Sequence, residues 1–255
     1  MPTVKASIES NILQNFTTFD NIITPSYLKK APFRNFLIAV ARSDGKLLNI
    51  LKRAHLNEHV GKAIVSQLLE LDLITLHESR EAPLKQFPKQ KLKKALRGYK
   101  IQPKIRFAHP FYHFWFGYIE PFRFELTRNN YDRFFEYFDK HAIRLTSLVF
   151  EQLSNDLIEM EFDTLSCGNY WDKNSEFDIL AITKNEKLIL GECKCKNKKI
   201  CKNELSKLQY KAKLSHILPT QWVLFSRNGF SNELKKSKQS DLKLYDLNDF
   251  KLFLR

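Results

Sequence analysis

The sequence lacks the features that would assign it to a specialised class of protein. Only 7 of its 255 residues are glycine and 9 are proline, which excludes collagen-like and low-complexity chains. Its four cysteines are too few for a disulfide framework. It has no apolar run of about 18 residues and no apolar segment at the N-terminus, so we predict neither a membrane span nor a secretory signal. We expect a globular protein of the reducing cytoplasm.

What the sequence has in excess is positive charge. It contains 42 Lys and Arg against 28 Asp and Glu, a formal net charge of +14. The charge is clustered: residues 80–106 hold ten Lys or Arg and one acid, and residues 194–213 hold eight Lys and one acid. Such clusters favour binding to phosphates, and we expect DNA as the partner, although charge alone does not distinguish DNA from RNA. The alternative is a generally lysine-rich, solvated surface.

The first part of the chain has the element order of a winged helix. Residues 1–28 are expected to be weakly structured. Helical patterns follow Pro32, cover residues 46–54 and follow the N-cap Asn57, and two strand patterns lie in 71–79 and 101–110. This order predicts a winged-helix-like domain over 29–108, with the basic extension 80–104 as an enlarged wing. The basic residues that we expect to contact nucleic acid here are Lys62, Lys85, Lys89, Lys91, Lys93, Lys94 and Arg97.

An aromatic connector follows, over residues 109–128. Its sequence HPFYHFWFGYIEPFRF could stack on bases, but the commoner outcome is an interdomain core with a few aromatic residues exposed, which is the interpretation that we favour. His109 and His113 have the i, i+4 spacing of metal ligands, but no carboxylate follows at a matching distance, so no metal is predicted there.

The remaining chain, residues 129–255, has the pattern of a mixed α/β domain. Helical sequence extends to about residue 160, and strands are predicted at 176–183, 187–196 and 221–227, with a helix at 203–217. A last strand and a short helix close the chain. We therefore expect an α/β (α+β) protein with a central mixed sheet in this domain.

The chemistry is concentrated in the hairpin over residues 176–194. Asp178 lies in the first strand, and Glu192 and Lys194 lie two apart in the second, so they share one face. If the turn has two residues, Asp178 lies opposite Cys193, one position away from both Glu192 and Lys194. A longer turn or a bulge places Asp178 on the same face as Glu192 and Lys194. Carboxylates suit Mg²⁺ or Mn²⁺, and a lysine can position or activate water and stabilise charge on a phosphate.

The cysteines of this hairpin admit two interpretations. Cys193 and Cys195 point to the face opposite Glu192, where cysteines are usually core residues. A zinc site that also used Cys201 is the alternative, but the paired spacing and the fourth ligand of such sites are missing. We favour the core.

The acid, hairpin and acid-x-Lys arrangement resembles the PD-(D/E)XK nuclease motif, with Phe177 in place of the proline. This resemblance implies a further acidic residue in the preceding helix, and Glu151 is the candidate. The resemblance gives Glu151 a catalytic and metal-binding role, together with the catalytic residues Asp178, Glu192 and Lys194. It also suggests accessory contacts from Gln209 and Tyr210 in the following helix. Lys196, Lys198 and Lys199, just after the motif, are expected to contact nucleic acid.

A second resemblance extends over residues 30–230. The strings FWFGYIEP, FEQL, YWDKNSEFDILAI, LILGECKCK and LFSRNGF are similar to the C-terminal region of archaeal-type P-loop ATPases, known as domain of unknown function 234. In that family an ATPase module precedes a winged helix and a nuclease-like domain, which implies a restriction-endonuclease-like fold here. The phosphate-binding loop GxxxxGK[ST] is absent from this chain, so we expect no nucleotide cofactor.

These observations predict a metal-dependent DNA endonuclease with a winged-helix DNA-binding domain. The alternative is a catalytically inactive DNA-binding module or regulator that acts with a separate ATPase. A basic scaffold for an acidic protein is a third option. No membrane partner is expected, and the sequence leaves open whether the chain forms a homodimer.

Overall fold

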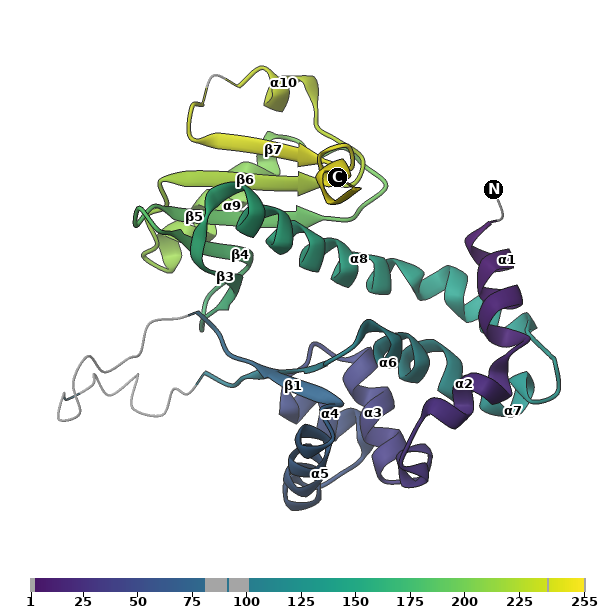
Figure 1. The fold of residues 1–255 in the computed structure, drawn as a ribbon. Coiled ribbons are helices and arrows are strands. Elements are labelled where there is room, and N and C mark those ends of the chain that lie inside the picture. The colour runs from purple at the N-terminus through teal and green to yellow at the C-terminus, as the bar shows by residue number, and fades with distance from the viewer. Residues whose placement is uncertain (1–2, 81–90, 92–100, 238, 255) are drawn as a thin grey trace. The chain divides into compact units, whose positions relative to one another are not determined.

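A computed structural model describes residues 3–80, 91, 101–237 and 239–254, and it divides the chain into two compact units (Figure 1). The first, which we call the helical unit, comprises residues 1–78 and 102–145; the second, the sheet unit, comprises residues 79–101 and 146–255. The protein is a mixed α/β protein, with a helical N-terminal region followed by a five-stranded mixed sheet. No helix of the described residues has the length and apolar character that crossing a membrane requires.

The helical unit contains the predicted order of three helices and a hairpin. Pro32 caps the first helix and the Asn57 side chain caps the third, where it accepts a hydrogen bond from the Val60 N–H at 2.9 Å. The elements of this stretch are α3 (Phe33–Arg42), α4 (Leu47–Ala54), α5 (Glu58–Glu70), β1 (Ile74–His77) and β2 (Lys104–Phe107). The two strands are antiparallel, with Ile74 opposite Phe107. Most of the predicted enlarged wing, residues 81–90 and 92–100, lies outside the described residues.

The expectation that residues 1–28 are weakly structured was wrong. The described part of this segment forms α1 (Val4–Ile8), a π-helical turn η1 (Glu9–Leu13), α2 (Phe16–Ile22) and a 3₁₀ turn η2 (Ser26–Lys29). Leu13, Phe16 and Leu28 are buried in the core of the helical unit, and the Phe16 ring stacks on Trp115 at 5.6 Å between centroids. The segment is ordered because it covers apolar residues from a distant part of the sequence.

The aromatic connector is buried, as predicted, but it forms part of the core of the helical unit, whereas the prediction was an interdomain core. It folds into short turns: α6 (Pro110–Phe114), η4 (Trp115–Ile119), η5 (Glu120–Phe122) and α7 (Arg123–Leu126). Trp115, Phe116 and Ile119 are fully buried.

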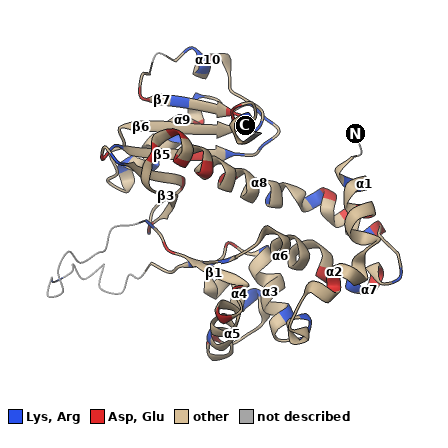
Figure 2. Ribbon diagram, viewed as in Figure 1, with Lys and Arg blue, Asp and Glu red and all other residues tan. Residues whose placement is uncertain are grey.

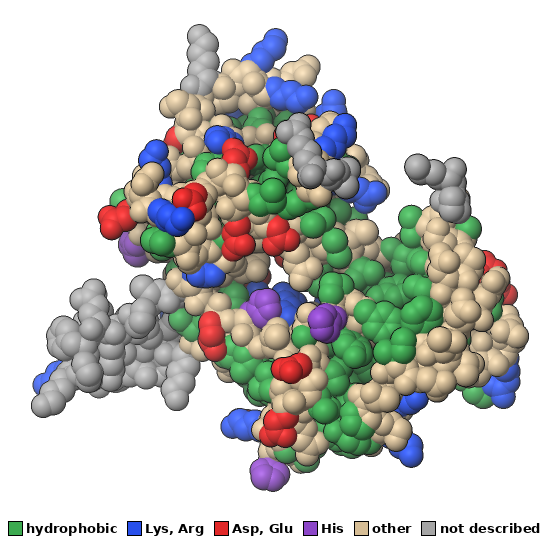
Figure 3. Space-filling model, in the orientation of Figure 1, with side chains coloured by type: hydrophobic (Ala, Val, Ile, Leu, Met, Phe, Trp, Pro, Cys, Tyr) green, Lys and Arg blue, Asp and Glu red, His purple; other side chains and the backbone are tan. Residues whose placement is uncertain are grey.

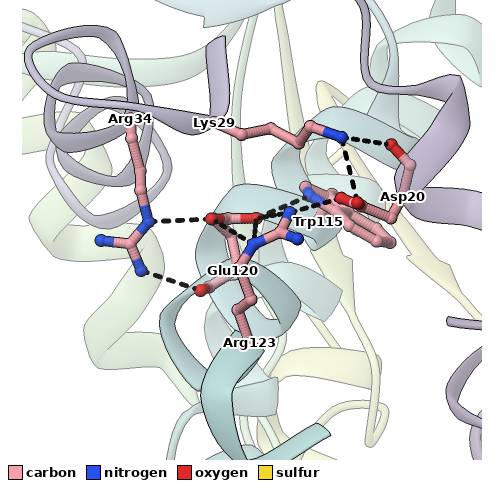
Figure 4. Close-up of polar contacts among 6 residues, drawn as sticks. All are labelled: Asp20, Lys29, Arg34, Trp115, Glu120 and Arg123. Carbon is pink, nitrogen blue, oxygen red and sulfur yellow. Dashed lines mark hydrogen bonds and ion pairs between the residues drawn. The ribbon is translucent and has the colours of Figure 1, made fainter. Parts of the chain in front are cut away.

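A buried carboxylate joins three segments of the helical unit (Figure 4). Glu120 is 0% exposed, and its Oε1 accepts hydrogen bonds from Arg34 at 2.8 Å and from Arg123 at 2.9 Å. Trp115 Nε1 donates to Oε2 at 3.3 Å. Arg123 also pairs with Asp20; burial would raise the pKa of Asp20, but its contacts with Arg123 and Lys29 together outweigh burial and lower this pKa. The network ties α2, α3 and the aromatic connector together.

The sheet unit has five strands in the order β3-β4-β5-β6-β7. The strands are β3 (Thr164–Trp171), β4 (Glu176–Thr183), β5 (Leu188–Lys194), β6 (Gln221–Ser226) and β7 (Leu242–Asp246). β3, β4 and β5 pair antiparallel, whereas β5, β6 and β7 pair parallel. The helices are α8 (Asp132–Phe162), α9 (Lys202–Leu214), α10 (Asn232–Lys235) and the 3₁₀ turn η6 (Asp249–Leu254). The boundary between the two units falls within α8, between residues 145 and 146, rather than at residue 129.

Two separate apolar clusters cover the two faces of the sheet. Leu157 and Ile158 of α8 pack with Ile179, Cys193 and Val223. On the other face, residues of α9 and α10 pack with the sheet: Leu205, Leu208, Ala212 and Leu234 cluster with Leu180, Leu190 and Leu224. The sheet is therefore sandwiched between α8 and α9, which explains why its central strands are apolar in both directions.

Candidate active site

The turn between β4 and β5 fixes the geometry of the candidate site. It contains three residues, Lys184–Glu186, because the Thr183 N–H donates to the Lys187 carbonyl at 3.0 Å. Glu186 has a positive φ of 58°, as is common at the end of a three-residue hairpin loop. The longer-turn alternative therefore holds rather than the two-residue turn. The register that pairs Ile179 with Gly191 brings Asp178 level with Glu192 at the next position.

Asp178 lies where β4 and β5 separate. Beyond the Ile179–Gly191 pair, the Cys193 N–H donates to Oδ2 of Asp178 at 2.8 Å, so a carboxylate replaces a strand carbonyl as the acceptor. Burial, followed by the charge of Glu192, raises the pKa of Asp178 to about 6. Among the described residues, Oδ1 has no hydrogen-bond donor. A cation between the two carboxylates would relieve their repulsion.

Glu192 is held by two lysines. Lys194 donates to its Oε1, and Lys211 of α9 donates to its Oε2 at 3.0 Å. Lys211 also donates to the Glu176 carbonyl at 3.1 Å, which anchors its ammonium at the start of β4. Burial is the largest single effect and lowers the pKa of Lys194, but the charge of Glu192, its hydrogen bond to Lys194 and the charge of Asp178 together outweigh burial and raise this pKa. Lys194 is therefore a cation at neutral pH rather than a base.

The sequence analysis missed Lys211 and named its neighbours instead. Gln209 is half-buried, and Tyr210 is 64% exposed; among the described residues, neither forms a hydrogen bond or an ion pair with Asp178, Glu192 or Lys194. The signal that could have found Lys211 is helical spacing, because it lies three residues after Leu208 and next to Ala212, both of which face the sheet.

Glu151 lies on α8, across the sheet from α9. Its backbone carbonyl accepts a hydrogen bond from Asn155 Nδ2 at 2.9 Å, and the same amide donates to the Asp178 carbonyl at 3.2 Å. The charges of Asp178 and Glu151 add to burial in raising the pKa of the Cys193 thiol. The C-terminal half of α8 is acidic (Figure 2). Glu151 is thus near the hairpin, on the Cys193 side.

The structure does not assemble three ligands around a metal position. Among the described residues, no group of three His, Cys, Asp or Glu side chains could hold an ion. Glu151 therefore does not complete a cluster with Asp178 and Glu192. Cys193 and Cys195 lie in the apolar cluster under α8, which agrees with their interpretation as core residues, and Cys201 is exposed.

The basic residues predicted to contact nucleic acid have different environments. Lys62 is exposed on α5 and pairs with Glu58 at 2.6 Å. Lys91, Lys196, Lys198 and Lys199 are exposed as well. Lys85, Lys89, Lys93, Lys94 and Arg97 lie outside the described residues. On the face of the sheet unit seen in the upper part of Figure 3, the basic and acidic side chains of the described residues are interspersed.

Comparison with known proteins identifies a family over part of the chain. Residues 115–208 match the model of a family described as archaea bacterial proteins of unknown function, DUF234. The resemblance to domain of unknown function 234 is therefore confirmed over these residues, which run from the aromatic connector through α8 and the hairpin into α9. No curated protein and no solved structure gave a significant match to the chain.

Proposed function

We propose that the protein is a metal-dependent nuclease that hydrolyses phosphodiester bonds in DNA. The observation that carries this proposal is the convergence of Asp178, Glu192 and Lys194 where β4 and β5 separate, with Lys211 contributed from α9. Two carboxylates and two ammonium groups at one point provide both a place for a divalent cation and positive charge for a phosphate.

The order of elements supports this proposal. In the sheet unit, a helix, three antiparallel strands, a helix and a parallel strand follow one another, as they do in restriction-endonuclease-like PD-(D/E)XK domains. In the helical unit, α3, α4, α5, β1 and β2 follow the order of a winged helix. We therefore propose a winged-helix domain joined to a nuclease-like domain. Fold alone does not establish activity, so the proposal depends on the site.

The donor set fits Mg²⁺ or Mn²⁺ through Asp178 and Glu192. Mg²⁺ is commonly bound by one or two carboxylates, with water and substrate phosphate as its other ligands, so a third protein carboxylate is not required. The unpaired oxygen of Asp178 and its raised pKa are what an acid beside a cation position would have. When bound, the cation would neutralise charge that develops on the phosphate and acidify water.

The lysines have separate roles in this proposal. Lys194, which remains protonated, would orient the phosphate and stabilise negative charge on it. Lys211 would hold Glu192 in place through its bond to the other carboxylate oxygen. Lys62, Lys91, Lys196, Lys198 and Lys199 would contact the DNA backbone, together with the basic residues of the extension.

A second candidate function is a catalytically inactive DNA-binding module, which would act with a separate ATPase. The observation that favours it is the double ion pair on Glu192, which satisfies both oxygens of this carboxylate with lysines. In this candidate the two lysines, rather than a metal ion, neutralise the charge of Glu192. This candidate predicts salt-sensitive DNA binding without cleavage.

Cleavage of supercoiled plasmid tests the proposal directly. Purified protein is incubated with plasmid in Mg²⁺, Mn²⁺ or EDTA, beside the variants Asp178→Asn and Lys194→Met. Lys207→Met is the matched control, since Lys207 is an exposed lysine of α9 that pairs with Glu204 and not with the site. We expect metal-dependent nicking by the wild type and the control, and a loss of at least about 100-fold in both site variants.

Two results would contradict the proposed nuclease activity. Equal nicking by Asp178→Asn would place the activity elsewhere or in a contaminant. Absence of nicking in every metal, combined with a gel shift that weakens as salt rises, would favour the binding module. A gel shift by all variants also shows that loss of nicking is not loss of folding.

A further inference from the structure

A basic pocket lies in the helical unit, and the described residues that line it all belong to this unit. It has a volume of about 610 Å³. Five of its lining side chains can carry positive charge: Arg42, Lys52, Arg53, His55 and Arg144. They come from the end of α3, the end of α4 and the part of α8 that belongs to the helical unit.

The cations of this pocket lack acidic partners. Among the described residues, no carboxylate forms an ion pair with Arg42, Lys52, Arg53 or Arg144. The acid in the lining, Asp44, is already occupied, since it accepts hydrogen bonds from the Lys46 N–H at 3.1 Å and from Asn49 Nδ2 at 2.9 Å. The pocket therefore has an excess of positive charge that the protein itself does not neutralise.

Arg42 is the fixed element of this pocket. Its Nε donates to the Gly117 carbonyl at 3.0 Å, and its guanidinium lies over the Tyr137 ring at 4.3 Å. Its Nη2 is buried without a hydrogen-bond partner among the described residues. Burial lowers the pKa of Arg42, and the nearby charge of Arg53 contributes to this shift. A buried donor without a partner is destabilising, so the Arg42 guanidinium has a hydrogen-bonding capacity that the described residues do not use.

Stabilisation of helix ends explains only some of the positive charges in this pocket. Cations are favoured at the C-terminal ends of helices, and Arg42, Lys52 and Arg53 lie in the last turns of α3 and α4. This explains their positions in sequence, but it does not explain why Arg144, from the middle of α8, lines the same pocket, or why Arg42 retains an unpaired donor.

We infer that this pocket binds a phosphate monoester that is about as large as a nucleotide. Arginine recognises phosphate with paired N–H donors, and Arg53 and Arg144 are both free to provide them. The volume admits a nucleoside as well as its phosphate. The monoester has two sources, a free nucleotide or the 5′ end of a nucleic acid strand, and its chemistry is the same in both.

Calorimetric titration in EDTA tests this inference independently of the nuclease, because metal-dependent chemistry is then suppressed. The probes are deoxyadenosine 5′-monophosphate, deoxyadenosine, and a short single strand with or without a 5′-phosphate. We expect the monophosphate to bind and the nucleoside not to bind. Arg53→Gln and Arg144→Gln should each weaken monophosphate binding about 10-fold.

Lys140→Gln is the matched control. Lys140 lies on α8 one turn before Arg144, is exposed and pairs with Glu136, so its loss removes the same charge outside the pocket. An unchanged affinity in this control supports the site, and an equal loss overturns it in favour of diffuse charge. Tighter binding of the 5′-phosphorylated strand than of the nucleotide identifies a strand end as the source; equal binding identifies the free nucleotide. No binding of any phosphorylated probe at millimolar concentration also overturns the inference.

Discussion

The buried Glu120 network gives the sharpest prediction for stability. Replacing Glu120 with Gln keeps the shape of the side chain but removes its charge and turns one acceptor into a donor that faces arginine N–H groups. Breaking a buried ion pair from one side costs about 3–5 kcal/mol. Arg34 and Arg123 keep 31% and 28% exposure, and Arg123 keeps Asp20, so the loss should lie near the lower end, about 3 kcal/mol.

The assay is thermal and urea unfolding followed by circular dichroism and tryptophan fluorescence, since Trp115 reports on the network directly. For a unit of this size, about 3 kcal/mol corresponds to a fall in midpoint temperature of roughly 10 °C. Glu125→Gln is the control, because Glu125 pairs with the exposed Arg133 in the same unit and should cost less than about 1 kcal/mol. If Glu120→Gln is no more destabilising than the control, the reasoning about buried charge is refuted.

Three further predictions concern other parts of the fold. Burial lowers the pKa of His113 to about 4, so between about pH 6.5 and pH 4 the unfolded chain binds a proton at this histidine that the folded chain does not bind. The free energy of unfolding should therefore be highest above about pH 6.5 and fall by about 3 kcal/mol toward pH 4. His113→Phe should reduce this pH dependence, as measured by urea unfolding at a series of pH values. Gly191→Ala would place a Cβ 2.3 Å from Val223 Cγ2 in the centre of the sheet, so unfolding curves should show a loss of about 1–3 kcal/mol; a neutral result would mean that the strands shift easily. Asn57→Ala removes the N-cap of α5 and should cost about 1 kcal/mol, whereas Asn57→Asp should retain most of the stability in the same assay.

The elements with strong local signals were predictable from the sequence. The strand over 176–183 was placed at its observed bounds because its apolar residues stand between a polar segment and a turn. The helix after Asn57 was found from its cap and its apolar spacing. In both cases the residues that define the element are neighbours in the sequence, so no tertiary information was needed.

The errors arose where distant residues decide the outcome. The first 28 residues have a weak helical pattern, and their order depends on contacts such as Phe16 with Trp115, which are about a hundred positions apart. The role of Lys211 depends on how α9 rests on the sheet, and a linear motif does not contain that information. Glu151, which was predicted from a family tendency, stays a prediction: its backbone carbonyl accepts a hydrogen bond from Asn155, and no group of three metal ligands is formed among the described residues.

The three-residue turn over 184–186 has a consequence for comparing related sequences. Because side chains alternate along a strand, one residue more or fewer in this turn would move Glu192 and Lys194 to the opposite face relative to Asp178. A relative could therefore carry every letter of the motif and have no assembled site. The number of residues that separates the two acids therefore matters as much as the acids themselves. An insertion or deletion of one residue in this exposed turn would distinguish sequences whose motif residues meet from sequences whose motif residues do not.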